Sequence, residues 1–309
     1  MVFYIVAFFL FGLIFGSFLN VCIHRMPLGL SVVRPRSGCP VCQAPIAAHD
    51  NIPVLSWVLL KGKCRNCQAR ISPRYAAVEL LTGAFFALSY YMAVTHYDPR
   101  PGPLAAKYCV LCFLLIGLIF TDAETKLLPD LLTKPGVVIG LLFSLLVEVE
   151  GPGDFILRNW IHHPANWRIV SFINACAGAA LGSAFILAVA LMYKVLRREE
   201  GMGQGDVKLM GLIGAFLGVK ITLLVLLAGS LIGSIFGLTL IFFVWRKRLA
   251  RRRSKIPSEP AKAARIRSWH SAILIYRNFE IPFGVFLGIA ALLAAFCGNV
   301  IFRWYWERM

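Results

Sequence analysis

Apolar runs alternate with polar stretches along all 309 residues of the chain. Runs of about 20 apolar residues are long enough to cross a bilayer as helices. The alternation therefore predicts an all-α polytopic membrane protein with about eight transmembrane helices. The predicted spans are 2–23, 75–95, 104–121, 131–147, 170–193, 207–219, 221–244 and 282–302. The span 207–219 is barely long enough to cross.

Composition supports a membrane protein and fixes its orientation. Hydrophobic residues make up 59% of the chain, more than in typical soluble domains. Residues 25–74 carry eight Lys or Arg against one acid, and residues 246–270 carry ten against one. Cytoplasmic loops retain positive charge, so both loops are predicted to lie in the cytoplasm and both termini outside. No basic-aromatic module is visible, so nucleic acid is not an expected partner, whereas membrane lipids are.

The pattern divides the chain into five parts. A first transmembrane helix, 1–24, is read as a retained helix because no positive region precedes it and no clear cleavage site follows it. The other parts are a cytoplasmic loop domain (25–74), a transmembrane core (75–245), a basic cytoplasmic loop (246–281), and a last helix with an aromatic tail (282–309).

Four of the nine cysteines form two Cys-x-x-Cys pairs in the first polar loop. They are Cys39 with Cys42 and Cys64 with Cys67. Each pair can place two thiolates on one tight turn, and two such turns can complete a tetrahedral zinc site. Free or redox-active pairs are the alternative. A closed four-cysteine site has no open position, so its Zn²⁺ is expected to be structural, as in zinc ribbons.

Two aspartates are the strongest candidates for chemistry. Asp206 follows Gly203-Gln204-Gly205 where the sixth span begins, and Asp122 ends the third span. Counting crossings puts both at the cytoplasmic side, where one carboxylate can act as acid while the other activates water. The plain alternative for Asp206 is an N-cap in a simple turn. The glycines are expected to adopt unusual φ/ψ angles and to leave room for a peptide.

Helix polarity predicts how the aspartates divide their roles. Asp206 would lie at a helix N-terminus, where partial positive charge favours the carboxylate, and Asp122 at a C-terminus, where ionisation is disfavoured. Asp206 is therefore expected to be the base and Asp122 the acid. Lys208, with Gly203 and Gly205, is expected to support the loop that carries Asp206. Candidate substrate or methylation residues are Asn20, Glu79, Glu124 and Asp130. For Asn20, a helix–helix hydrogen bond is the alternative to a substrate contact.

These residues resemble the type IV prepilin peptidases, also called leader peptidase/N-methyltransferases, which are membrane aspartic proteases with a Gly-x-Gly-Asp motif. The resemblance covers nearly the whole chain. Its motifs are Gly16-Ser17-Phe18-Leu19-Asn20-Val21, the two Cys-x-x-Cys pairs, Asp50-Asn51-Ile52-Pro53-Val54-Leu55-Ser56-Trp57, Ile71-Ser72-Pro73-Arg74-Tyr75, Val78-Glu79-Leu80-Leu81-Thr82, Asp122 through Asp130, and Gly201 through Leu209.

The resemblance implies that Asp122 and Asp206 are the catalytic pair. The implied substrate is a prepilin or pseudopilin precursor with a basic leader, cut after a glycine at the cytoplasmic face of the bacterial plasma membrane. It also implies N-methylation of the new amine from S-adenosylmethionine, with the cysteine-bearing loop implicated. Glu79, Glu124 and Asp130 are candidates to receive the basic leader.

The chain departs from the family at two positions. Glu124 stands where many members have a second Asp, and Val285 where many have proline. Both departures are expected to leave the catalytic groups untouched. The main alternative function is a cation-coupled membrane transporter using the same acids, and a third is a zinc-bearing membrane adaptor without chemistry.

Overall fold

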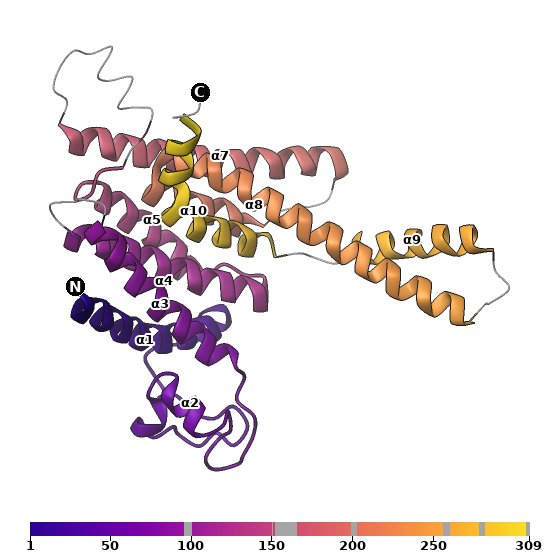
Figure 1. Ribbon diagram of the computed structural model, residues 1–309, viewed down its shortest axis with the longest axis horizontal. Coiled ribbons are helices and arrows are strands. Elements are labelled where there is room, and N and C mark those ends of the chain that lie inside the picture. The colour runs from indigo at the N-terminus through magenta and orange to yellow at the C-terminus, as the bar shows by residue number, and fades with distance from the viewer. Residues whose placement is uncertain are drawn as a thin grey trace.

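The computed structural model describes residues 1–95, 101–149, 151, 166–198, 203–255, 260–277 and 282–306. This part of the chain is helical and contains no named strand, as predicted (Figure 1). The long helices are α1 (Val2–Arg25), α3 (Arg74–Thr95), α4 (Pro101–Thr125), α5 (Asp130–Ser144), α7 (Trp167–Arg197), α8 (Gln204–Lys255), α9 (Ala261–Arg277) and α10 (Phe283–Trp306). The short ones are η1 (Met26–Leu28), η2 (Ala48–Asn51) and α2 (Leu55–Leu59).

Five of the described helices are long and apolar enough to span a membrane: α1, α3, α4, α7 and α8. The apolar part of α10, Phe283–Gly298, is shorter, and α5 has 15 residues. The predicted count of about eight spans is therefore not confirmed, although each predicted span overlaps a helix.

The predicted spans 207–219 and 221–244 are the two arms of α8. The expected loop 218–220 is reduced to Gly218, whose φ of 73° and ψ of 178° break the helix at a conformation that favours glycine. A methyl group at Gly182 would lie 2.8 Å from the carbonyl oxygen of Met210 and 3.0 Å from Cγ2 of Thr222. Twelve residues of straight helix would separate those atoms by about 18 Å. The arms therefore fold back on one another beside α7.

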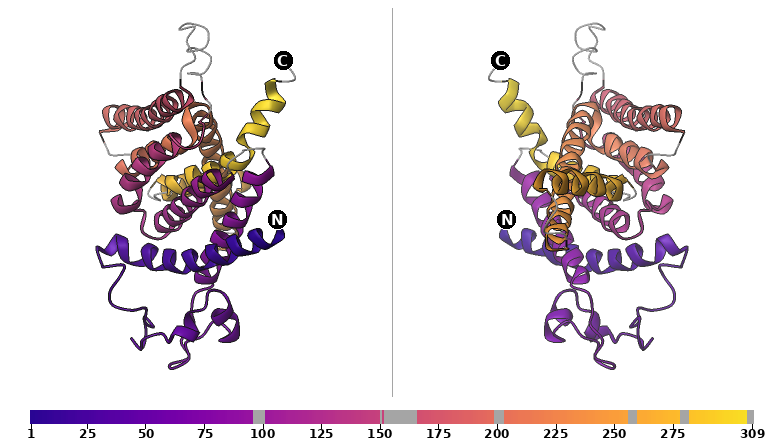
Figure 2. Two further views of the ribbon diagram at one scale, coloured as in Figure 1. Left: turned by 90° about the vertical axis from the view of Figure 1, so that its left-hand side faces the viewer. Right: turned by 90° about the vertical axis from the view of Figure 1, so that its right-hand side faces the viewer.

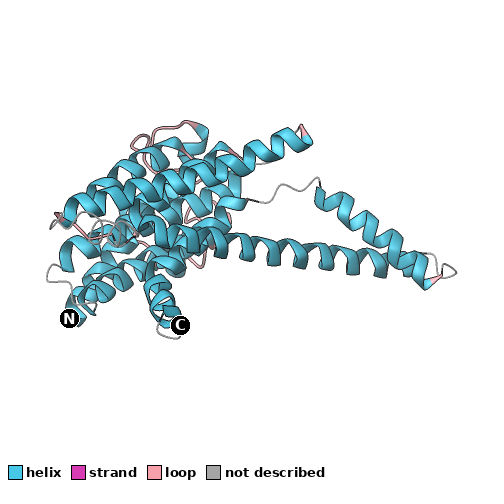
Figure 3. Cartoon of the chain, turned by 90° about the horizontal axis from the view of Figure 1, so that it is seen from above, coloured by secondary structure: helices cyan, strands magenta, loops and turns pink. Residues whose placement is uncertain are grey.

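The predicted basic loop 246–281 is also helical over its described residues. The second arm of α8 continues to Lys255, and α9 returns beside it as a hairpin that projects from the bundle (Figure 3). Small buried residues, Ala264, Ser268 and Ala272, recur every four positions along α9 and permit close packing. Residues 256–259 and 278–281 of this predicted loop lie outside the described residues, as do Gly201 and Met202.

The core of the bundle is formed by α4 and the first arm of α8. Its largest fully buried side chains include Leu111, Leu115, Leu118, Met210, Ile213 and Phe216. The Cys109 and Cys112 thiols are buried here as packing groups.

Helix α1 packs on α3 through small residues. A methyl group at Gly12 would lie 2.7 Å from Cα of Gly83, and one at Gly16 would lie 2.7 Å from Cα of Glu79. Only glycine at these two positions allows the backbones of α1 and α3 to approach this closely. The spacing of four residues between Gly12 and Gly16 predicts such a contact. The cysteine-bearing loop lies beside α1 and α3, on the opposite side from α7 (Figures 1 and 2).

Candidate active site and four-cysteine centre

Asp122 and Asp206 are both buried at helix ends. Asp122 lies in the last turn of α4 and is 5% exposed; Asp206 lies in the first turn of α8 and is 8% exposed. Buried carboxylates are costly unless they have partners or a function, so both positions stand out from the apolar bundle.

Gly284 shows that the two carboxylates meet. A methyl group at Gly284 would lie 2.8 Å from Oδ2 of Asp122 and 3.2 Å from Oδ1 of Asp206. The two oxygens are therefore no farther apart than the sum of these distances. The predicted juxtaposition of the aspartates is present, and α10 forms the third side of the site. Gly284 is not among the residues predicted from the sequence, although it stands within the motif Pro282-Phe283-Gly284-Val285.

Val285 also belongs to the site, contrary to the expectation that its departure from proline leaves the catalytic groups untouched. Its backbone N–H donates to Oδ2 of Asp122 at 2.9 Å. This amide is one of the first-turn groups of α10 that have no partner within their own helix. Proline has no N–H and could not make this hydrogen bond. The departure therefore changes the surroundings of a catalytic candidate directly.

The glycines before Asp206 do not have the predicted backbone role. Neither Gly203 nor Gly205 has a positive φ. Gly205 is needed for packing instead, because a methyl group there would lie 2.9 Å from Cβ of Leu128. A methyl group at Gly203 would have room, because its nearest neighbour would be the backbone nitrogen of Gly205 at 3.9 Å. The carbonyl oxygen of Gly203 accepts the backbone N–H of Asp206 at 3.2 Å.

Ion pairs connect the segment after each aspartate to a neighbouring helix. Glu124 pairs with Arg74 at the start of α3. Lys208 lies 2.5 Å from Oδ1 of Asp130 at the start of α5, and Lys134 lies 2.6 Å from the other oxygen. Lys208 thus links the first part of α8 to the start of α5. Glu124 and Asp130 already face cations, so a basic leader would compete with these partners.

Asn20 and Glu79 lie together between α1 and α3. The Asn20 side chain donates to the carbonyl oxygen of Tyr75 at 2.9 Å, which confirms the helix–helix hydrogen bond. Its Oδ1 is buried and has no partner within the described chain. Glu79 accepts the backbone N–H of Val54 at 2.7 Å, which ties α3 to the cysteine-bearing loop.

The four cysteines of the loop converge as predicted. Their sulfur atoms all lie within 4.8 Å of one another, with 3.8 Å between Cys39 and Cys67 and 4.0 Å between Cys42 and Cys64. Tetrahedral zinc with bonds of about 2.3 Å separates its sulfur ligands by about 3.8 Å. The residues therefore fit a structural Zn²⁺. Backbone N–H groups of Cys42 and Val41 lower the pKa of the Cys39 thiol to about 6, whereas burial and the neighbouring thiols raise the pKa of the Cys67 thiol to about 11.

The two Cys-x-x-Cys turns have the same local structure. Gln43 and Gln68 each follow the second cysteine of a pair and adopt a positive φ. Each turn is closed by a backbone hydrogen bond, from Cys39 to Ala44 and from Cys64 to Ala69. Two equivalent knuckles facing one another account for the convergence of four ligands.

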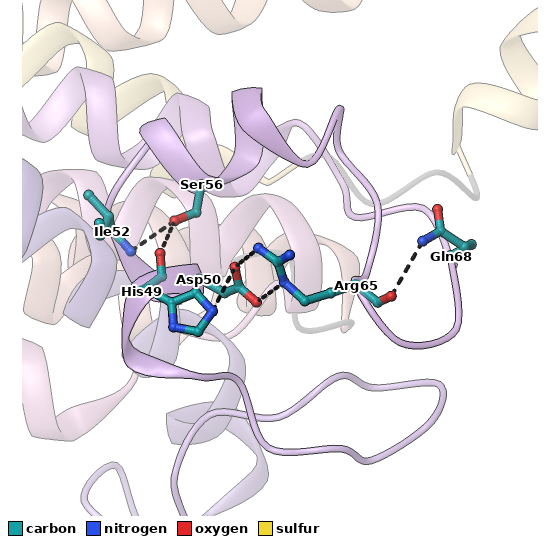
Figure 4. A network of polar contacts seen from close by, with 6 residues as sticks. All are labelled: His49, Asp50, Ile52, Ser56, Arg65 and Gln68. Atoms are coloured by element: carbon teal, nitrogen blue, oxygen red, sulfur yellow. Dashed lines mark hydrogen bonds and ion pairs between the residues drawn. The ribbon is translucent and has the colours of Figure 1, made fainter.

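Asp50 and Arg65 connect one knuckle to the segment before α2 (Figure 4). Arg65 donates Nε to one Asp50 oxygen at 2.7 Å and Nη2 to the other at 2.6 Å. The guanidinium holds the pKa of Asp50 below its usual range. Nearby, Ser56 donates to the carbonyl oxygen of His49 and accepts the N–H of Ile52. These bonds position the loop around α2.

Comparison with known proteins agrees with this arrangement. A model of the bacterial peptidase A24 N-terminal domain matches residues 10–93, and a model of the type IV leader peptidase family matches residues 109–238. A prepilin leader peptidase/N-methyltransferase of Aeromonas salmonicida is 37% identical over 96% of this chain and 92% of the relative. The protein of that name from Klebsiella pneumoniae is 41% identical over 68% of this chain and 83% of the relative.

The chain belongs to the type IV leader peptidase family. No solved structure matches it. The family membership supports the peptidase interpretation and gives no support to the transporter.

The two matched regions divide the candidate residues. Asn20, Glu79 and the four cysteines lie in the N-terminal domain, whereas Asp122 and Asp206 lie in the peptidase region. Gly284 and Val285, which complete the aspartate site, follow both matched regions.

Proposed function

We propose that this chain is a membrane aspartic endopeptidase that removes a short basic leader from prepilin or pseudopilin precursors. Cleavage follows a glycine at the cytoplasmic face of the bacterial plasma membrane. The observation that carries the proposal is the meeting of Asp122 and Asp206 around Gly284. The names of the relatives supply the class of substrate.

The two carboxylates divide the chemistry of peptide hydrolysis. The backbone donor of Val285 stabilises the ionised form of Asp122, whereas no hydrogen-bond donor to Asp206 is found in the described part of the chain. We therefore assign Asp122 as the base and Asp206 as the acid, the reverse of the assignment from helix polarity. Asp122 takes a proton from water as its oxygen attacks the scissile carbonyl carbon. Asp206 donates a proton to the nitrogen that leaves when the C–N bond breaks.

The position of the dyad suits a substrate whose apolar helix remains in the membrane. Both aspartates lie at helix ends, so the scissile bond need only reach the end of the bundle. The basic leader would compete with Lys208 and Lys134 for Asp130, whose side chain is 45% exposed. Asp130 is thus the more exposed of the two acids beside the dyad, because the Glu124 side chain is 36% exposed.

We further propose that the chain methylates the new N-terminal amine, as the names of the relatives say of those proteins. S-adenosylmethionine would supply the methyl group. Zn²⁺ at the four cysteines would hold the loop domain in shape, because a closed site of four sulfurs has no position for a reactant.

The cleavage proposal is tested with the purified full chain in detergent. The substrate is a synthetic precursor with a basic leader, a glycine and an apolar segment, and mass spectrometry identifies the products. The wild type should cut after the glycine, and the double variant Asp122→Asn/Asp206→Asn should not. Cleavage of the same bond by the double variant would refute the proposal.

A further inference from the structure

A cavity of about 580 Å³ lies between α1, the first half of α3 and the cysteine-bearing loop. Small-molecule sites typically have volumes of roughly 300–1,000 Å³. Neither catalytic aspartate lines this cavity. It lies within the N-terminal domain that the first family model matches.

The membrane-side wall of the cavity contains an uncompensated carboxyl group. Glu79 is 8% exposed, and its partners within the described chain are neutral: the N–H of Val54 and the side chains of Ser17 and Asn20. The other acid of the lining, Asp50, is already paired with Arg65. Glu79 is therefore the acid of the lining without an ion-pair partner among the described residues, and Arg25 and Arg70 line other parts of the same cavity.

Asn20 adds a second acceptor to the same wall. It is 4% exposed, its amide nitrogen is bound to the carbonyl of Tyr75, and its Oδ1 has no partner within the described chain. Buried polar atoms are almost always hydrogen-bonded, so an unpaired oxygen beside a cavity indicates a missing donor. A ligand with several N–H donors and a positive charge fits Glu79 and Asn20 together.

The rest of the cavity suits a nucleoside. Its aromatic lining residues are Trp57 and Tyr75, and aromatic rings can stack on a base. The guanidinium of Arg74 lies over one face of the Tyr75 ring, 4.6 Å from its centroid. Trp57 is fixed by its hydrogen bond to the carbonyl of Ile71 and by close packing on Gly62. The volume, the aromatic lining and the acceptors fit S-adenosylmethionine beside a primary amine.

We propose that this cavity is the methyl-transfer site, in which Glu79 and Asn20 hold the new N-terminal amine and Trp57 and Tyr75 hold the adenosyl part of S-adenosylmethionine. The inference rests on the proposed function, and it places methylation in a different site from leader cleavage. Glu79 takes one proton from the ammonium group. The lone pair of the neutral amine then forms the N–CH₃ bond as the S–CH₃ bond breaks, and that bond's electron pair stays on sulfur.

The two sites are linked through the start of α3. Arg74, which precedes Glu79 on α3, pairs with Glu124, which follows Asp122 on α4. This ion pair places the helix that carries Glu79 against the helix that carries Asp122. Two of the four cysteines, Cys39 and Cys64, also line the cavity. This explains why a closed metal site belongs to a methyl-transfer domain: it holds one wall in place.

Cofactor binding is tested with adjacent alanines in the loop. Ala47 lines the cavity and Ala48 does not, and both are exposed. Binding of S-adenosylhomocysteine to the full chain is measured by isothermal titration calorimetry. Ala47→Trp should weaken binding by about tenfold or more, because the new ring occupies the cavity, while Ala48→Trp binds as the wild type does.

Leader cleavage should continue in both variants, so failure of this inference is separable from failure of the peptidase proposal. Unchanged binding in Ala47→Trp, or an equal loss in Ala48→Trp, would overturn it.

The role of Glu79 is tested on a peptide that already lacks its leader, so that peptidase activity is not required. Glu79→Gln should slow methylation by roughly 100-fold or more, the effect expected for loss of a general base. Its affinity for S-adenosylhomocysteine should remain that of the wild type, because Glu79 holds the amine. Methylation at the wild-type rate, or loss of S-adenosylhomocysteine binding, would overturn the assignment of Glu79.

Discussion

Val285 donates its backbone N–H to Asp122 at 2.9 Å, although 163 positions separate the two residues. The last helix thereby becomes part of a site whose carboxylates come from α4 and α8. Gly284, the preceding residue, lies against both carboxylates. The beginning of α10 is thus as much a part of the candidate active site as the Gly-x-Gly-Asp motif.

Gly284→Ala should slow leader cleavage by about 100-fold while leaving the fold intact. Gly284 does not have a positive φ, so alanine fits its backbone, but the new methyl group would lie 2.8 Å from Asp122 and 3.2 Å from Asp206. Displacing one catalytic group by about 1 Å can cost about 100-fold in rate. Initial rates of cleavage measure this loss. Gly102→Ala is the matched control, because nothing lies within 4 Å of the added methyl group. Equal rates in the two variants would show that Gly284 does not limit the site.

Asp130→Asn should weaken recognition of the basic leader more than it slows the chemistry. The change removes a negative charge and leaves Lys134 and Lys208 to repel the leader. KM should rise about tenfold, equivalent to about 1.4 kcal/mol, with little change in kcat. The effect should vanish for a peptide whose leader cations are replaced by glutamine. An equal effect on both peptides would instead assign Asp130 to positioning Lys208.

Cys67→Ser should release zinc from the purified full chain. Each of the four sulfurs completes one tetrahedral site, so loss of one ligand opens the centre. Elemental analysis should find about one zinc per wild-type chain and much less in the variant. Limited proteolysis within residues 26–73 should accelerate in parallel. Cys297→Ser is the control, because Cys297 is an exposed cysteine outside the centre. Stoichiometric zinc in Cys67→Ser would contradict the four-cysteine assignment.

Asp50→Asn should accelerate zinc loss to a chelator by the same factor at pH 8 and pH 9. Arg65 holds the pKa of Asp50 below its usual value of about 3.9, so the carboxylate is ionised throughout this range. The pair stabilises the loop fully above about pH 4, and this contribution is lost as the pH falls through the lowered pKa. Chelator competition followed by absorbance measures the rates. A factor that differed between the two pH values would show that another group controls the loop.

Much of the site could be predicted from particular residues. The four-cysteine spacing, the Gly12 and Gly16 contact and the meeting of Asp122 with Asp206 all follow from local pattern and alternating topology. Gly284 and Val285 could not be found in this way, because their role depends on where α10 packs. The φ expected for Gly203 and Gly205 was wrong because packing on Leu128, and not backbone strain, selects glycine at 205.

The predicted loops 218–220 and 246–281 were wrong because contacts between helices determine the structure of both segments. Hydropathy finds two spans around Gly218 but cannot show that a single glycine reverses the chain. Charge in 246–281 suggested a loop, whereas Ala264, Ser268 and Ala272 allow α9 to pack on α8. Neither the cavity nor the unpaired oxygen of Asn20 has a sequence pattern of its own.

The most direct test of the central claim compares initial cleavage rates of Asp122→Asn, Asp206→Asn and the double variant. Residues that act as one catalytic unit have non-additive effects, so each single substitution should lose about as much activity as both together. Glu148→Gln, which removes an exposed carboxylate beyond the C-terminal end of α5, should cleave like the wild type. A single variant that retained the wild-type rate, or two partial losses that multiplied in the double variant, would contradict a joint catalytic site at Asp122 and Asp206.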